Sequence, residues 1–105
     1  MNFPVRSISA ETLLSEQRTH ADTMLIDVRT LREIEQDKIQ LETLHIDFLD
    51  AGFEKAVESL DRFNAYILIC DTGKRSRMAC EWMASKGFML VSWLNGGKST
   101  LDQLT

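Results

Sequence analysis

Residues 65–87, AYILICDTGKRSRMACEWMASKG, decide the fold. The first part of this stretch, residues 66–70, is apolar at every position, which is typical of a central strand in a parallel sheet that is buried on both faces. A polar loop follows, and residues 76–86 then predict a helix that ends at Gly87, because glycine is common just beyond the C-terminus of a helix. A buried strand, a polar loop and a helix make up the repeating unit of α/β proteins.

The rest of the chain alternates in the same way between strand and helix patterns. Pro4 restricts the first predicted strand, residues 3–8, to a strand start or a sheet edge, because proline cannot donate a hydrogen bond to a neighbouring strand. Residues 37–50 give a weak signal, with one short strand in a longer connection. Further strands are predicted at residues 24–27 and 88–93, and helices at residues 9–19, 30–36, 51–63 and 99–104. Ser9 is expected to cap the first of these helices, and Thr30 to open the second. The alternation predicts an α/β fold, with a mostly parallel sheet of about five strands and helices on both faces.

Length and composition limit the class of protein. The chain has 105 residues, of which 44% are hydrophobic and 27% charged, and this predicts one domain over residues 1–105. The net charge of −4 argues against a nucleic-acid partner, since binding to phosphates requires positive charge. The longest apolar run, residues 65–70, is too short for a membrane span. With two cysteines and no signal-peptide pattern, we expect a cytoplasmic protein with reduced thiols and no membrane partner.

The loop after the central strand combines a cysteine, a glycine and several basic residues. Cys70 ends the strand and faces the N-terminus of the next helix, where free N–H groups and partial positive charge favour thiolate over thiol. Gly73 allows successive N–H groups to point inward as an anion-binding nest. Three basic residues outnumber Asp71, so residues 70–77 carry a net charge of +2. The pattern predicts a reactive thiolate in an anion cradle; the alternative is a buried structural cysteine followed by a solvated helix start.

Three motifs in register carry a resemblance to a known family. Residues 70–75 read C-x-x-G-x-R, residues 27–33 read D-V-R-x-x-x-E, and residues 94–97 read L-x-G-G. With these motifs the chain resembles the single-domain rhodanese-like sulfurtransferases over nearly its whole length. The loop is also similar to that of rhodanese domains within larger bacterial proteins. The resemblance implies the three-layer rhodanese-like fold.

The resemblance also implies roles for individual residues. Cys70 would be the nucleophile that takes a sulfane sulfur and holds it as a persulfide. Arg75 would support the loop and the anionic donor, and Asp27 would help to position the loop or, alternatively, cap the next helix. Arg29 and Glu33 would form a structural ion pair. The sulfur and the donor would be held by the backbone amides of the remaining loop residues, Asp71, Thr72, Gly73, Lys74 and Ser76.

The implied reaction needs neither a metal nor an organic cofactor, and His20 and His45 lack metal-ligand spacing. The implied partners are a small thiosulfate-like anion as sulfur donor and a thiol as acceptor, with a carrier protein as another acceptor. The chain departs from the family at residues 37–42, where DKIQLE replaces G-H-I-x-G-A. Asp71 stands where members that prefer thiosulfate carry a basic residue, so we expect thiosulfate to be a poor donor.

Two other functions stay open at this point. One is a non-catalytic binding or regulatory module of a larger protein. The other is a cysteine phosphatase or arsenate reductase, whose loop places the arginine seventh, whereas here Arg75 is sixth and Ser76 seventh. The second cysteine, Cys80, is predicted to be a core residue, with a resolving thiol as the alternative. The large side chains predicted to join it in the core are Trp82, Met83, Phe88 and Trp93.

Overall fold

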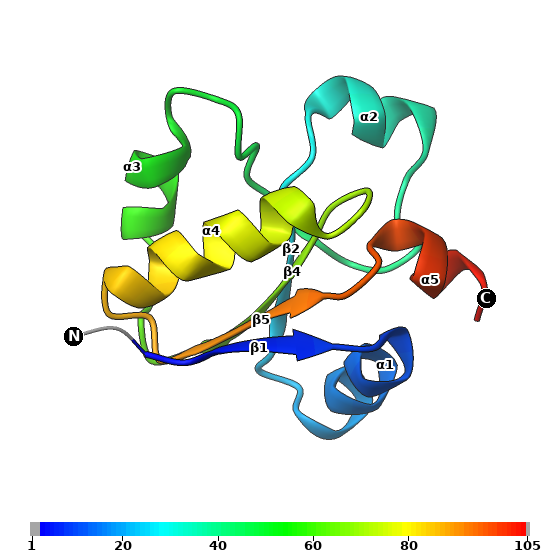
Figure 1. Ribbon diagram of the computed structural model, residues 1–105, viewed down its shortest axis with the longest axis horizontal. Coiled ribbons are helices and arrows are strands. Elements are labelled where there is room, and N and C mark those ends of the chain that lie inside the picture. Colours follow the sequence, from blue (N-terminus) through cyan, green and yellow to red (C-terminus); the bar gives the residue numbers. More distant parts are fainter. Residues whose placement is uncertain (1–2, 105) are drawn as a thin grey trace.

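The computed structural model describes residues 3–104. Strands and helices alternate along the chain (Figure 1). The strands are β1 (Val5–Ile8), β2 (Met24–Asp27), β3 (Leu44–His45), β4 (Ala65–Ile69) and β5 (Leu90–Leu94). The helices are α1 (Ala10–Thr19), α2 (Leu31–Gln36), α3 (Phe53–Glu58), α4 (Lys74–Ser85) and α5 (Lys98–Asp102). None of the helices within the described residues is long and apolar enough to cross a membrane.

The five strands form one sheet in the order β1-β5-β4-β2-β3, and all neighbouring strands are parallel. β4 lies at the centre, and its residues from Tyr66 to Ile69 are buried, as the apolar run predicts. β1 lies at an edge, and Pro4 immediately precedes it. The predicted α/β fold with a parallel sheet is confirmed.

Helices cover both faces of the sheet and enclose two apolar cores. On one face α3 and α4 pack against the strands through residues such as Val57 and Met83. On the other face α1 and α5 contribute Leu13 and Leu101. α2 belongs to neither core, because none of its residues is buried; it lies near the carboxyl ends of the strands (Figure 1). Ligands of open α/β sheets bind at the carboxyl ends of the strands, and here the loops after β2 and β4 meet at that edge of the sheet.

The third helix is shorter than the sequence predicts. The spacing of apolar residues predicts a helix over residues 51–63, whereas α3 ends at Glu58. The Ser59 hydroxyl donates to the carbonyl oxygen of Ala56 (2.7 Å), and the Asp61 carboxylate accepts from the N–H of Phe63 (2.8 Å). Short polar side chains that bind the nearby backbone in this way compete with the helix and end it.

Signals at three other helix ends are confirmed. Ser9 caps α1, because its hydroxyl oxygen accepts from the N–H of Thr12 (3.1 Å). Thr30 and Glu33 form a reciprocal capping box at the start of α2. Gly87, with a φ of 94°, follows the C-cap of α4 and turns the chain toward β5.

Candidate active site

The Cys70 sulfur lies at the carboxyl end of the central strand β4, where the chain turns into α4. It accepts a hydrogen bond from the N–H of Gly73 (N···S 3.1 Å) and a longer one from the N–H of Ser76 (3.4 Å). The Ser76 hydroxyl oxygen is 3.3 Å from the same sulfur. Cys70 is only 1% exposed. These donors are placed to stabilise negative charge on the sulfur.

The other loop residues that the sequence predicts for binding lie at the surface. Asp71, Thr72 and Lys74 are exposed, whereas Gly73 and Ser76 are buried. The N–H groups that contact the Cys70 sulfur itself come from the two buried residues, Gly73 and Ser76.

Gly73 has to be a glycine for two reasons. Its φ of 101° is a left-handed conformation that other residues resist, and a Cβ atom here would meet the Trp93 ring at 3.0 Å and the Leu94 carbonyl oxygen at 3.2 Å. The same residue is the N-cap of α4. A larger residue would displace the N–H group that contacts the Cys70 sulfur.

The turn after β5 supports the loop from the other side. A Cβ atom at Gly97 would collide with the carbonyl group of Asp71, and the N–H of Lys98 donates to the carbonyl oxygen of Cys70 (2.9 Å). The sequence identifies residues 94–97 as a family motif but not this close approach of two backbones. The paired glycines before a helix are the signal that points to it.

Arg75 joins the loop to α2. Its guanidinium makes two parallel hydrogen bonds to the Glu33 carboxylate, of 2.6 and 2.7 Å. The guanidinium, with help from Thr30, lowers the pKa of Glu33 to about 2. Arg75 is predicted to support the loop, and the side chain that it binds is Glu33 of helix α2.

The predicted ion pair between Arg29 and Glu33 is wrong. Arg29 is buried and binds the carboxylate of Asp27, with Nε–Oδ1 and Nη2–Oδ2 distances of 3.0 and 2.9 Å. The resemblance implies this pair, but Arg29 lies before Thr30, the N-cap of α2, and so outside the helix that carries Glu33. Glu33 is free to bind Arg75 instead.

The same interaction engages the carboxylate of Asp27. Within residues 3–104, every hydrogen bond of its carboxylate goes to Arg29, including one from the Arg29 N–H (3.1 Å). Asp27 does not cap the next helix either, since Thr30 does so. The geometry shows a buried pair at the end of β2 and no hydrogen bond from Asp27 to the loop.

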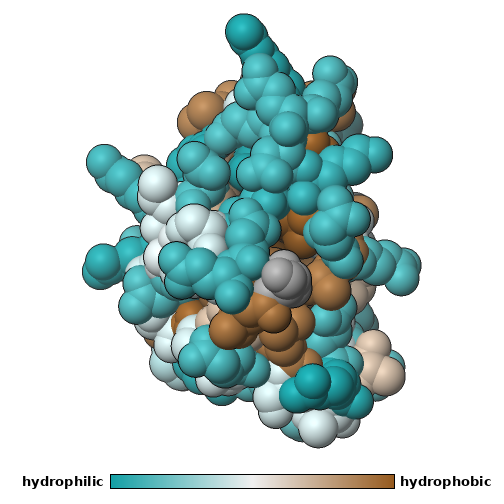
Figure 2. All heavy atoms as spheres, turned by 90° about the vertical axis from the view of Figure 1, so that its right-hand side faces the viewer, coloured by the Kyte–Doolittle hydropathy of each residue, from teal (hydrophilic) through white to brown (hydrophobic). Residues whose placement is uncertain are grey.

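A second ion pair ties α2 to the molecule. The Lys98 side chain is 4% exposed, and its Nζ binds Asp37, the C-cap of α2, at 2.9 Å and Asp102 at 2.8 Å. Lys98 follows the turn that supports the loop, and the sequence did not single it out. Figure 2 shows the face that carries α2, α5 and α1, and its upper part, where α2 lies, is mostly hydrophilic. Polar contacts, rather than a buried apolar face, hold α2 in place.

Cys80 and the large apolar residues pack as core. The Cys80 sulfur is buried beneath α4 and donates to the carbonyl oxygen of Ser92 (3.2 Å), and burial raises the pKa of its thiol. Met83 and Phe88 are fully buried, whereas Trp82 and Trp93 are partly buried at the margin of the same core. Within residues 3–104, no three His, Cys, Asp or Glu side chains gather as metal ligands.

Comparisons with known proteins agree with this geometry. The sequence profile described as rhodanese-like domain matches residues 9–101. "Putative sulfurtransferase YtwF" of Bacillus subtilis (strain 168) is 30% identical over 93 residues, which are 89% of this chain and 86% of that protein. The tRNA sulfurtransferase of Shewanella sediminis (strain HAW-EB3) is 30% identical over 76% of this chain, but the chain spans only 18% of that protein's length.

Solved structures show the same fold. The rhodanese-related protein of Thermoplasma volcanium superposes with a TM-score of 0.77 at 25% identity, and the match covers 93% of this chain and 92% of that one. A rhodanese-like domain protein from Staphylococcus aureus has a TM-score of 0.79 at 21% identity, over 91% of this chain and 90% of the other. By sequence profile, relatives and fold alike, this chain belongs to the rhodanese-like domain family.

Proposed function

We propose that the protein is a sulfurtransferase that carries sulfane sulfur on Cys70 as a persulfide. The observation that carries the proposal is the cradle around the Cys70 sulfur, made by the N–H groups of Gly73 and Ser76 and by the Ser76 hydroxyl. Membership of the rhodanese-like family and two relatives named as sulfurtransferases support it.

The reaction has two steps. In the first step the Cys70 thiolate attacks the outer sulfur of a donor such as thiosulfate; a new S–S bond forms, the S–S bond of the donor breaks, and sulfite leaves with its electron pair. In the second step a thiol acceptor, deprotonated, attacks the terminal sulfur, and Cys70 leaves as the thiolate. The acceptor is then a persulfide, or thiocyanate when cyanide is used. A covalent intermediate of this kind divides one difficult transfer into two easier steps.

Ser76 can follow the charge on the sulfur. Its hydroxyl is 3.1 Å from the Gly73 carbonyl oxygen and 3.3 Å from the Cys70 sulfur. While Cys70 is a thiol, the hydroxyl donates to the carbonyl and accepts the S–H; when Cys70 is a thiolate, the hydroxyl donates to the sulfur. A small rotation of the Ser76 hydroxyl would therefore stabilise the Cys70 thiolate before it attacks the donor and again when it leaves in the second step.

The donor would be held mainly by the start of α4. Arg75 is engaged by Glu33, so it supports the loop more than it binds the anion. Lys74 is exposed at the first turn of α4, where its charge and the N-terminus of the helix both attract an anion. Asp71, also exposed, opposes a doubly charged donor. We expect the physiological acceptor to be a thiol, small or on a carrier protein.

Steady-state kinetics with thiosulfate and cyanide test the reaction. We expect parallel double-reciprocal lines, the signature of a reaction in which the first product leaves and a covalent intermediate remains on the enzyme before the second substrate binds. Cys70→Ser should abolish turnover, and Cys80→Ser, which replaces the other buried cysteine, should keep it. Circular dichroism would show that both variants are folded. Turnover retained by Cys70→Ser, or none by the wild type with any sulfur donor, would contradict the proposal.

A further inference from the structure

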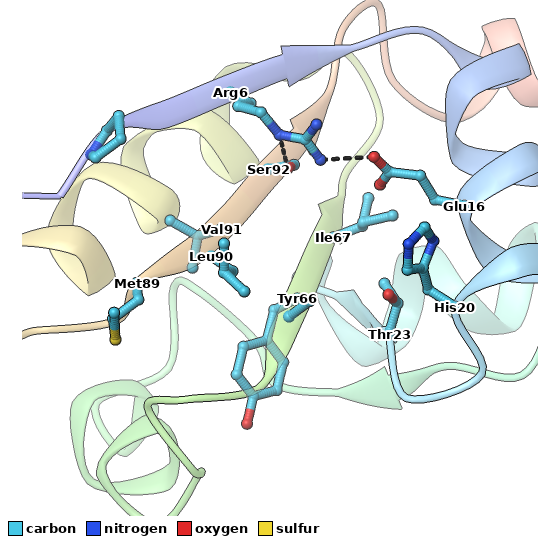
Figure 3. A pocket seen from close by; sticks show the side chains of 12 residues that line it. Arg6, Glu16, His20, Thr23, Tyr66, Ile67, Met89, Leu90, Val91 and Ser92 are labelled. Carbon is cyan, nitrogen blue, oxygen red and sulfur yellow. Dashed lines mark hydrogen bonds and ion pairs between the residues drawn. The ribbon is translucent and has the colours of Figure 1, made fainter.

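A cavity of about 300 Å³ opens at the amino ends of β1, β4 and β5, at the opposite end of the strands from Cys70 (Figure 3). It lies on the sheet face that α1 and α5 cover only in part, because α5 has five residues and packs through Leu101, near the carboxyl end of β5. This space equals about ten water molecules in volume and is at the small end of ligand pockets.

The floor of the cavity is an apolar part of the sheet. Ile67 is buried there, while Leu90, which also lines the cavity, is 58% exposed. Leu90 and Ile67 lie on neighbouring strands and border the open space in Figure 3. A flat apolar molecule resting on this floor would remove the Leu90 side chain from water.

The wall beside the floor is polar, and its positive and negative charges balance. Arg6 binds Glu16 (Nη2–Oε1 2.8 Å) and the Ser92 hydroxyl oxygen (Nε–Oγ 3.2 Å), as Figure 3 shows. Within residues 3–104 these are the only hydrogen bonds of the two charged groups, so further guanidinium N–H donors lie beside an unused carboxylate oxygen. The His20 ring and the Thr23 side chain line the same wall.

We propose that this cavity binds a small, uncharged, planar heterocycle whose edge carries an N–H donor beside a carbonyl acceptor. The Arg6–Glu16 pair has no net charge, so it favours neither an anion, which Glu16 would repel, nor a cation, which Arg6 would repel. Its adjacent donor and acceptor complement the lactam edge of such a ring, while the ring face packs on Leu90 and Ile67. A few convergent polar groups above an apolar floor are typical of small-molecule sites.

The test uses uracil as the probe and 1,3-dimethyluracil as its matched control, because methylation removes both N–H donors and keeps the ring. Titration of the ¹⁵N-labelled protein, followed by amide chemical shifts, should show saturable changes at Arg6, Thr23, Leu90 and Ser92 with uracil. We expect 1,3-dimethyluracil and the anion benzoate to bind at least about tenfold more weakly.

Two variants locate the site. Leu90→Lys puts a charge on the apolar floor and should abolish the uracil-induced changes, whereas Leu49→Lys, at a leucine 66% exposed and outside the cavity, should not alter them. The proposal is overturned if uracil causes no saturable change, if 1,3-dimethyluracil binds equally well, or if Leu90→Lys binds like the wild type. Sulfur transfer plays no part in the readout, so the outcome is independent of the proposed function.

Discussion

Ser76 offers two groups to the Cys70 sulfur, and only its hydroxyl depends on the side chain. We expect Ser76→Ala to lower kcat/KM for thiosulfate about tenfold or more, because a hydrogen bond to a charged group contributes about 1.5–3 kcal/mol. Folding should change little, since the Gly73 carbonyl oxygen keeps the N–H of Arg77 (3.0 Å). Ser85→Ala is the matched control: its hydroxyl donates to the Trp82 carbonyl oxygen (2.6 Å) at the far end of the same helix. Equal kinetics for the two variants would contradict the role of the hydroxyl.

Alanine substitutions at Gly73 and Gly87 distinguish the loss of stability caused by a positive φ from the loss of sulfur transfer caused by damage to the site. Both glycines have positive φ, of 101° and 94°, so replacement of either by alanine should lower the unfolding free energy by about 1–2 kcal/mol. Only at Gly73 would the new Cβ press on the Trp93 ring; at Gly87 its nearest neighbour is the flexible Arg62 side chain at 3.5 Å. Gly73→Ala should therefore lose sulfur transfer and Gly87→Ala keep it. Denaturant unfolding and kinetics, measured together, check the pair, and full activity in Gly73→Ala would refute the cradle.

At the scale of elements, α2 is the least anchored helix, because it buries no residue in the core. It is held over the loop by Glu33–Arg75 at one end and Asp37–Lys98 at the other. Both ion pairs join α2 to segments that position Cys70. Arg75 belongs to the first turn of α4, and the N–H of Lys98 donates to the Cys70 carbonyl oxygen. The geometry of the loop thus depends on where α2 lies.

Glu33 gives this arrangement a pH dependence. Its pKa is about 2 in the folded protein against an ordinary value of 4.5, so folding favours the ionised carboxylate. The stabilisation is complete above the ordinary value and is lost as the pH falls from 4.5 through about 2. We expect Glu33→Gln to be less stable than the wild type at neutral pH, and this difference in unfolding free energy to shrink over that range.

Glu35→Gln is the control for that series, because Glu35 is exposed on the same helix and makes no ion pair with residues 3–104. Its unfolding free energy should follow the wild type at each pH. If the difference in unfolding free energy between the wild type and Glu33→Gln stays constant down to about pH 2, the ion pair between Glu33 and Arg75 does not stabilise the fold.

For the whole molecule, charge opposes the donor. The chain carries −4, and Asp71 stands exposed beside Cys70, so a dianion such as thiosulfate meets repulsion at long and short range. Asp71→Lys should raise kcat/KM for thiosulfate about tenfold over the wild type, and this ratio should fall as salt is added, because salt screens the charges. Asp22→Lys changes the net charge equally from an exposed turn after α1 and should have a much smaller effect. Equal effects of the two substitutions would assign the repulsion to net charge rather than to Asp71.

Local patterns predict most of this architecture. The apolar run of β4, the caps at Ser9 and Thr30, and the position of Cys70 at a strand end all follow from short-range rules that the structure confirms. The Arg75–Glu33 and Lys98–Asp37 pairs join residues 42 and 61 positions apart, so no local pattern contains them. The Arg29–Glu33 pair that the resemblance implies is wrong for a local reason, because Arg29 precedes the N-cap of α2 and so lies outside the helix that carries Glu33.

Measuring the intact mass of the reduced protein after brief exposure to thiosulfate tests the persulfide on Cys70 most directly. The wild type and Cys80→Ser should each gain the mass of one sulfur atom, and cyanide should remove it; Cys70→Ser should gain nothing. A wild-type protein that gains no sulfur from any donor, or a Cys70→Ser protein that gains it equally, would contradict the central claim.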